Sequence, residues 1–174
     1  WQSIASRAVH PVESAVVSVT QFHAGDTWNV LPATAVLRGT VRSFAPAVRD
    51  LVETRMGEIA RSLATGFGLT ADFRYERRYP STINSPAETE IARIAAARVV
   101  GEANLDLDPT PSMGAEDFAY MLQKKPGCYV WLGAGTADGG RNLHSPHYDF
   151  NDALLPLGAS YWVRLVETTM PKAA

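Results

Sequence analysis

Apolar residues recur at intervals of three and four in the longest regular stretch of the chain, which predicts an amphipathic helix over residues 46–66. Pro46 at its start and Gly66 at its end match the usual punctuation of helices. Three further helices are expected, at residues 86–100, 115–127 and 152–170. Residues 1–9 carry a helical apolar face without a capping residue, so we expect them to end a helix that begins upstream.

Runs rich in β-branched residues and alternating runs predict the strands. Residues 14–22 and 35–44 form the first two, and residues 71–80 and 128–135 form the others. Up to residue 80 the order is therefore the end of a helix, two strands, a helix and a strand. A ferredoxin-like βαββαβ unit shows this order when its first strand and most of its first helix precede Trp1.

The segment PSTINSP at residues 80–86 combines two prolines, two serines and an asparagine, which favours a boundary between two structural pieces. After it, helices and strands alternate in the α/β manner over too few residues to close a sheet. A length of 174 residues allows one large domain or two small ones, and the shares of 46% hydrophobic and 20% charged residues are typical of globular proteins. The expected fold class is α/β, in two pieces.

Composition excludes several kinds of function. A net charge of -2 offers no excess of Lys and Arg for phosphate groups, so no nucleic-acid partner is expected. The chain has no run of 18 apolar residues, which excludes a membrane span. The single cysteine, Cys128, excludes an internal disulfide and an all-cysteine metal site, and its apolar surroundings favour an inert thiol over a nucleophile.

The richest group of chemically active side chains is LHSPHYDFND at residues 143–152. It holds two histidines and two aspartates, namely His144, His147, Asp149 and Asp152. Neutral imidazole is a good ligand for zinc, cobalt or manganese, and a nearby carboxylate can fix its tautomer. Pro146 keeps the two histidines off a common helix, however, so their spacing leaves both a surface role and a ligand role open.

Two other strings are equally ambiguous. In SMGAEDFAYML, Glu116 and Asp117 could act as ligand, base or orienting groups, although acids are common at a helix start because the helix dipole stabilises them. In FHAGDTWNVLP, His23 could be catalytic and the Asn29 amide could hold a carboxylate. A loop needs Gly, Asp, Asn and Pro for its backbone alone, however, so a structural role stays open for both residues.

Together and in this order, FHAGDTWNVLP, MGAEDFAYML and LHSPHYDFND closely resemble the C-terminal part of the metal-dependent aminoacylase and hippurate hydrolase family. The resemblance covers essentially the whole chain and includes RGTVRSF, RYPSTINSP and WLGAG. Members of this family hydrolyse N-acyl amino acids, hippurate or auxin conjugates, and related carboxypeptidases belong to it.

The resemblance implies a catalytic α/β domain with two metal ions, interrupted by a ferredoxin-like lid through which the protein forms a homodimer. Residues 1–80 would be the later part of the lid, and residues 85–174 the closing segment of the catalytic domain. His144 matches the last metal ligand, and Asn29 matches a lid residue that reaches the partner subunit's active site to hold substrate. His147 falls on a variable position, and Glu116 and Asp117 would shape the site without binding metal.

The implied reaction is hydrolysis of an N-acyl amino acid by a water molecule that two divalent ions activate, with zinc, manganese or cobalt as the metal. The other ligands, the general base and a lid histidine belong to the family's upstream half, so no catalytic residue is expected here and the 174 residues alone should be inactive. The expected location is cytoplasmic. The alternatives are a non-catalytic dimerisation or binding module, and a carboxypeptidase or diaminopimelate deacylase of the same family.

Overall fold

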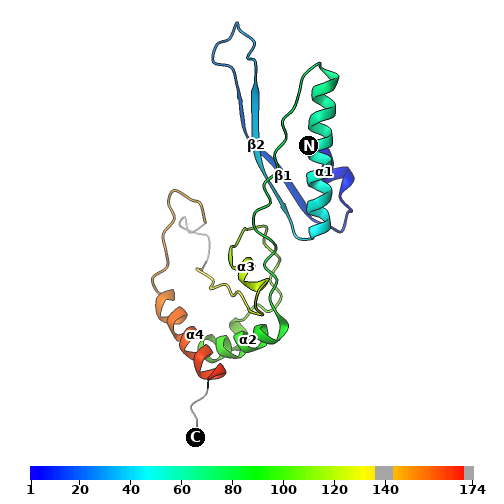
Figure 1. Cartoon of the computed structure of the whole chain (residues 1–174). Helices are drawn as coiled ribbons and strands as arrows, with labels where there is room; N and C mark the ends of the chain where they lie inside the picture. The colour runs from blue at the N-terminus through cyan, green and yellow to red at the C-terminus, as the bar shows by residue number, and fades with distance from the viewer. Residues whose placement is uncertain (136–142, 171–174) are drawn as a thin grey trace. The chain divides into compact units, whose positions relative to one another are not determined.

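The computed structural model describes residues 1–135 and 143–170 (Figure 1). The chain folds into two compact units. Unit 1 comprises Trp1–Ser81 with Ser112–Glu116, and unit 2 comprises Thr82–Pro111 with Asp117–Ala174. The junction between Ser81 and Thr82 lies inside the PSTINSP segment, and the short stretch 112–116 belongs to unit 1 although its neighbours in sequence belong to unit 2.

Unit 1 is built on an antiparallel hairpin. Strands β1 (Ala15–Ala24) and β2 (Ala35–Ser43) pair along their whole lengths, with a register shift between Val19 and Gln21. Both correspond to strands expected from the sequence, which are thereby confirmed. Local pattern was sufficient here because the partner strand is the next element in the chain, across a loop at residues 25–34 that contains Gly25 at a φ of 70°.

Helix α1 (Pro46–Gly66) packs against this hairpin, and its bounds are those predicted from the sequence (Figure 1). The buried core of the unit consists of Ile4, Val9, Val17, Val48, Val52 and Met56. Ile4 lies in η1 (Ile4–Ala8), a short π-helical turn in place of the α-helical turns that the periodicity predicted. The Trp1 indole Nε1 donates a hydrogen bond of 3.0 Å to the Met56 carbonyl, which ties this turn to α1.

The strand predicted at residues 71–80 is wrong, because this segment joins no sheet. Its alternate side chains nevertheless point inward, and Phe73 and Tyr75 pack against the core. Burial raises the pKa of the Tyr75 phenol. Arg77 then forms ion pairs with two carboxylates of α1, those of Asp50 and Glu53. The alternating pattern thus reports burial correctly, but a strand also needs a neighbour for hydrogen bonding, and the sheet described in this unit has two strands only.

Gly39 of β2 faces Val19 of β1 at a point that leaves no space for a side chain. A Cβ atom at this position would lie 2.0 Å from the Ser18 carbonyl oxygen and 3.1 Å from the Val19 Cα. Backbone atoms cannot move away as a side chain can, so Gly39→Ala should lower the free energy of unfolding by about 2–3 kcal/mol. Urea denaturation measures this loss.

Gly66→Ala is the matched control for this prediction. A Cβ atom at Gly66, the last residue of α1, meets nothing within 4 Å, so the change should leave stability equal or slightly increased. Equal effects of the two substitutions would contradict the close approach at Gly39.

Unit 2 is organised around two packed helices, α2 (Pro86–Val100) and α4 (Leu154–Thr169). The α2 side of the contact contains the buried Ala92 and Ala95, whose small side chains permit close approach. The half-buried positions of α4 recur at helical spacing and are Leu154, Gly158, Tyr161, Leu165 and Thr168. Arg98 donates to the Thr168 hydroxyl at 2.9 Å at one end of this contact. Both helices were predicted within two residues.

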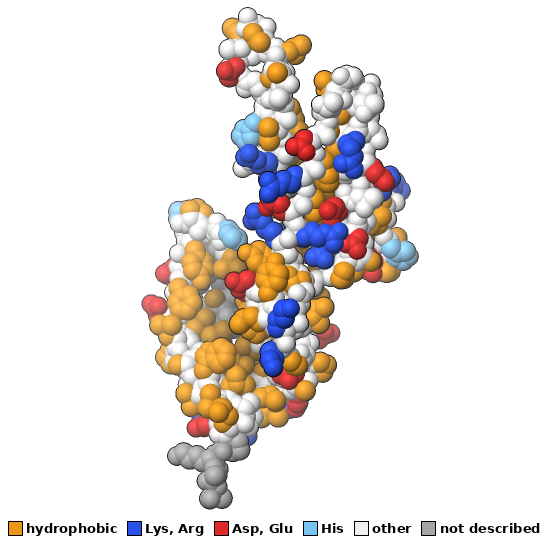
Figure 2. Space-filling view, viewed as in Figure 1, with side chains coloured by type: hydrophobic (Ala, Val, Ile, Leu, Met, Phe, Trp, Pro, Cys, Tyr) orange, Lys and Arg blue, Asp and Glu red, His pale blue; other side chains and the backbone are white. Residues whose placement is uncertain are grey.

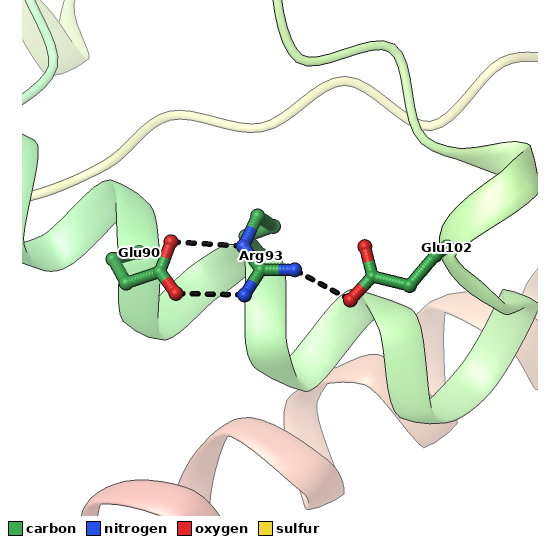
Figure 3. A network of polar contacts seen from close by, with 3 residues as sticks. All are labelled: Glu90, Arg93 and Glu102. Atoms are coloured by element: carbon green, nitrogen blue, oxygen red, sulfur yellow. Dashed lines mark hydrogen bonds and ion pairs between the residues drawn. The ribbon is translucent and has the colours of Figure 1, made fainter.

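The middle of α2 is joined to the short 3-10 turn η2 (Glu102–Asn104) by one guanidinium group (Figure 3). Arg93 donates from Nε and Nη2 to both carboxylate oxygens of Glu90, and from Nη1 to Glu102. The hydrogen bond from Arg93 lowers the pKa of the Glu90 carboxyl. A lowered folded-state pKa stabilises the fold at neutral pH, and this contribution is lost as falling pH protonates Glu90.

The second strand that the sequence misplaced is the one predicted at residues 128–135, since this segment also lacks strand pairing. Side chains replace the missing strand neighbour at its beginning. The Asn84 amide accepts a hydrogen bond from Tyr129 N at 2.8 Å and donates one to the Tyr129 carbonyl at 2.9 Å. Ser85 makes a similar pair of contacts with the backbone of Gly127.

Unit 2 exposes an unusual amount of apolar surface. On α4, Leu155, Trp162 and Val166 are 59%, 63% and 53% exposed, and no residue of this helix is buried. Trp131 is 74% exposed. Hydrophobic side chains cover much of the visible face of this unit in Figure 2. Exposed apolar surface of this extent is typical of a face that is covered by another protein or by another part of the same protein.

Among the described residues, no helix is both long and apolar enough to cross a membrane.

Candidate functional site

His144, the predicted metal ligand, lies in unit 2 in a turn that precedes α4. Ser145 shapes this turn, because its hydroxyl accepts from His147 N at 3.1 Å and its carbonyl accepts from Tyr148 N at 3.1 Å. His144 is exposed and has a φ of 66°, the one non-glycine residue with positive φ among those described. This left-handed conformation costs about 1 kcal/mol or more, and such residues concentrate at binding and catalytic sites.

The structure does not gather the other candidates of LHSPHYDFND around His144. His147, Asp149 and Asp152 are exposed. Within residues 1–135 and 143–170, no three His, Cys, Asp or Glu side chains lie close enough together to hold a metal ion. The exposed imidazole of His144 fits one position in the coordination shell of a divalent ion such as zinc, and a catalytic zinc takes about three protein ligands. The described residues can therefore supply one ligand to a metal site, but they do not form a complete metal site.

The base of the His144 turn is fixed by Asn151, a residue that sequence reasoning missed. Its Nδ2 donates to the Ala134 carbonyl at 3.2 Å, and its Oδ1 accepts from Ala153 N at 3.3 Å. Asn151 is half-buried. The sequence does offer a signal for it, because the side chain of an asparagine in a turn can accept a hydrogen bond from the backbone N–H two residues further on.

The SMGAEDFAYML string is divided between the units. Arg42 of β2 donates from Nη1 to the Met113 carbonyl, which holds the beginning of the string against unit 1. Helix α3 (Phe118–Leu122) starts later and is shorter than predicted, so Glu116 and Asp117 precede its first helical residue, and Asp117 is its N-cap. Arg42 was also missed, since an arginine on a strand gives no indication in the sequence of which backbone it contacts.

Asn29, the predicted substrate-binding residue, lies in unit 1 in the loop that joins β1 to β2. Every residue of this loop is exposed, and its neighbour Trp28 is completely exposed at 101%. His23, on β1 opposite Val36, is exposed as well. Asn29 and His144 thus belong to different units, and each lies on the surface of its own.

Cys128, which the sequence analysis interpreted as an inert thiol, is half-buried in unit 2, and its Sγ lies 3.8 Å from the Tyr129 carbonyl oxygen. Nearby, burial raises the pKa of the Tyr161 phenol, and Cys128 adds to this shift. Neither residue lies in one of the three motifs.

Comparison with known proteins agrees with the motifs. Residues 4–168 match the model of peptidase family M20/M25/M40, and the chain belongs to this family. It is 35% identical over 162 residues to an N-acetyl-L-cysteine deacetylase of Bacillus subtilis, a match that covers 93% of this chain and 37% of the relative. It is 32% identical over 164 residues to a hippurate hydrolase of Campylobacter jejuni, covering 94% of this chain and 42% of the relative.

Solved structures show the same relationship. A Bacillus subtilis protein described as a dinuclear metal-binding peptidase of the M20 family is 34% identical and superimposes with a TM-score of 0.71, over 90% of this chain and 42% of the other. An aminohydrolase of Staphylococcus aureus gives a TM-score of 0.72 at 27% identity, over 98% and 44%. The resemblance to the aminoacylase and hippurate hydrolase family is confirmed, and so is the mixed α/β class. The chain spans about two fifths of the length of its curated relatives.

Proposed function

We propose that these residues form part of a metal-dependent amidohydrolase that cleaves the amide bond of N-acyl amino acids. The observation that carries the proposal is the family match over residues 4–168, together with His144 in its left-handed turn. The relatives include deacetylases and a hippurate hydrolase, all named for the removal of an acyl group from an amino acid or a related compound.

The metal site of this proposal contains His144 as the ligand from these residues. The remaining ligands and the general base are proposed to come from residues outside the 174, as the family resemblance implies, and the described residues contain no cluster of three potential ligands. The exposed apolar side chains of α4 and the exposed Trp131 support this division, since a complete catalytic domain would cover them. Two divalent ions, of zinc, manganese or cobalt, are proposed by analogy with the dinuclear neighbour from Bacillus subtilis.

Unit 1 is proposed to act as the later part of a lid that also dimerises, with residues 85–174 closing the catalytic domain. The loop between β1 and β2 supports a role in association, because Trp28 and Leu31 are almost fully exposed beside Asn29. In this arrangement Asn29 acts in the active site of the partner subunit, where its amide holds the substrate carboxylate or the developing oxyanion. The protein is proposed to be cytoplasmic.

A panel of substrates tests the proposed reaction on the full-length protein. It should contain N-acetyl amino acids, hippurate, N-acetyldiaminopimelate and a peptide with a free C-terminus. We expect hydrolysis of at least one N-acyl amino acid, dependent on a divalent metal, and none by the 174 residues alone. Cleavage of the peptide alone would favour a carboxypeptidase, consistent with a relative from Saccharolobus solfataricus that bears this name. No hydrolysis of any compound by the metal-loaded full-length protein would favour a non-catalytic binding module.

A further inference from the structure

Two asparagines hold the two ends of the extended stretch that leads toward His144. Near the beginning, the Asn84 side chain makes paired hydrogen bonds with the backbone of Tyr129, as a neighbouring strand would. At the other end, the Asn151 side chain donates to the Ala134 carbonyl. The stretch between Tyr129 and Ala134 therefore keeps its position in unit 2 without belonging to a sheet.

Asn151 differs from Asn84 in what else it joins. Its Oδ1 accepts a hydrogen bond from Ala153 N, immediately before α4 begins at Leu154, and its carbonyl accepts from Leu154 N at 3.0 Å. One side chain thus connects the end of the extended stretch to the start of the helix. Ala134 and Asn151 are 17 residues apart in sequence and are brought together by this side chain.

His144 lies between these two joined points of the chain. Between His144 and α4, the side chain of Asn151 makes such a contact with the Ala134 carbonyl, seven residues after His144. The backbone of His144 is in the left-handed region. A metal ligand must be held within about 0.5 Å of its productive position, and ligands on loops need support from residues that do not touch the metal. The bond between Asn151 and Ala134 supplies such support to an exposed turn.

We propose that Asn151 is a positioning residue for His144, a role that rests on the proposed function of His144 as a metal ligand. Asn151 acts through the backbone and does not itself bind the metal. The Nδ2 atom is the essential group, because its hydrogen bond to the Ala134 carbonyl holds the chain after His144 against the extended stretch. The Oδ1 atom instead accepts from Ala153 N at the start of α4. Removing the Nδ2 donor should release the His144 turn and leave the α2–α4 contact in place.

The test compares Asn151→Asp with the matched control Asn84→Asp in the full-length protein. Aspartate keeps the shape of asparagine and its accepting oxygen, but it replaces the donor with an acceptor that faces a carbonyl oxygen. The zinc dissociation constant, measured by competition with a chromophoric chelator, should rise about tenfold in N151D. It should stay at the wild-type value in N84D, which loses an equivalent hydrogen bond at the end of the stretch that is farther from His144 in sequence.

Hydrogen exchange of the metal-free protein gives a second readout that does not depend on zinc. The amides of residues 143–150 should exchange faster in N151D than in the wild type and should be unchanged in N84D. Should N151D fail to fold, Asn151→Ala, which adds no charge, carries the same expectations. Unchanged zinc affinity in N151D would overturn the positioning role, even with faster exchange, because Asn151 would then be merely structural. A wild-type protein that binds no zinc would instead overturn the proposed function, and this role with it.

Discussion

Replacing His144 with alanine in the full-length protein should lower its hydrolysis of N-acyl amino acids by about a thousandfold, because metal-ion catalysis contributes several kcal/mol to the stabilisation of the transition state and each 1.36 kcal/mol is a factor of ten. The turn itself should tolerate the change, since the His144 side chain is exposed and the hydrogen bonds that shape the turn belong to Ser145. Steady-state kinetics with a saturating metal concentration, on protein whose circular dichroism matches the wild type, measures the loss.

His147→Ala is the control for this experiment. His147 lies three residues away in the same turn and is equally exposed, so its replacement removes the same kind of side chain from the same surface. We expect its activity to stay within about threefold of the wild type, since the family resemblance places no ligand there. Equal losses in the two variants would mean that the assignment between the two histidines is wrong.

Asn29→Ala should lower kcat/KM by about a hundredfold while leaving the metal content unchanged. The loop that carries Asn29 is fully exposed, so the substitution should cost little stability. Loss of one positioned hydrogen-bond donor from an oxyanion site typically costs a factor of about 100 to 1000 in kcat. A fall in kcat would assign Asn29 to the oxyanion, whereas a rise in KM at constant kcat would assign it to the substrate carboxylate.

Mixing two inactive variants tests whether Asn29 acts on the partner subunit. In a dimer of one His144→Ala chain and one Asn29→Ala chain, one of the two sites combines an intact His144 with an intact Asn29 from the other subunit. Random exchange makes half of the dimers mixed, so the mixture should recover about a quarter of wild-type activity. No recovery, in a mixture shown to contain mixed dimers, would place Asn29 in the active site of its own subunit.

Helices α1, α2 and α4 could be predicted because their signals are local. Pro46 and Gly66 mark α1, and Pro86 and Gly101 mark α2, where Gly101 adopts a φ of 81° just past the last helical residue. The hairpin was equally accessible, since its strands are neighbours in sequence. The segment at 71–80 was predicted as a strand because its alternation reflects the inward-facing Phe73 and Tyr75. The segment at 128–135 was predicted as one because it is apolar, although Val130, Trp131 and Leu132 are exposed. Strand pairing depends on a neighbour that the segment itself does not specify.

The candidate site was predictable only through the family resemblance. The spacing of His144 and His147 left the role of His144 open. Nothing in the sequence around His144 predicts its left-handed backbone conformation. Asn84 and Asn151 are typical loop residues in the sequence, and their contacts with Tyr129 and Ala134 span 45 and 17 residues. A side chain that substitutes for a strand neighbour cannot be distinguished from an ordinary turn residue until the backbone that it contacts is in place.

The central claim is that this chain contributes His144 to the metal site of an amidohydrolase, and metal content tests it most directly. Full-length protein, saturated with zinc and then freed of unbound metal, should contain about two zinc ions per chain in the wild type and about one in His144→Ala, as measured by elemental analysis. A wild-type protein without stably bound zinc, or a variant that retains both ions, would contradict the account.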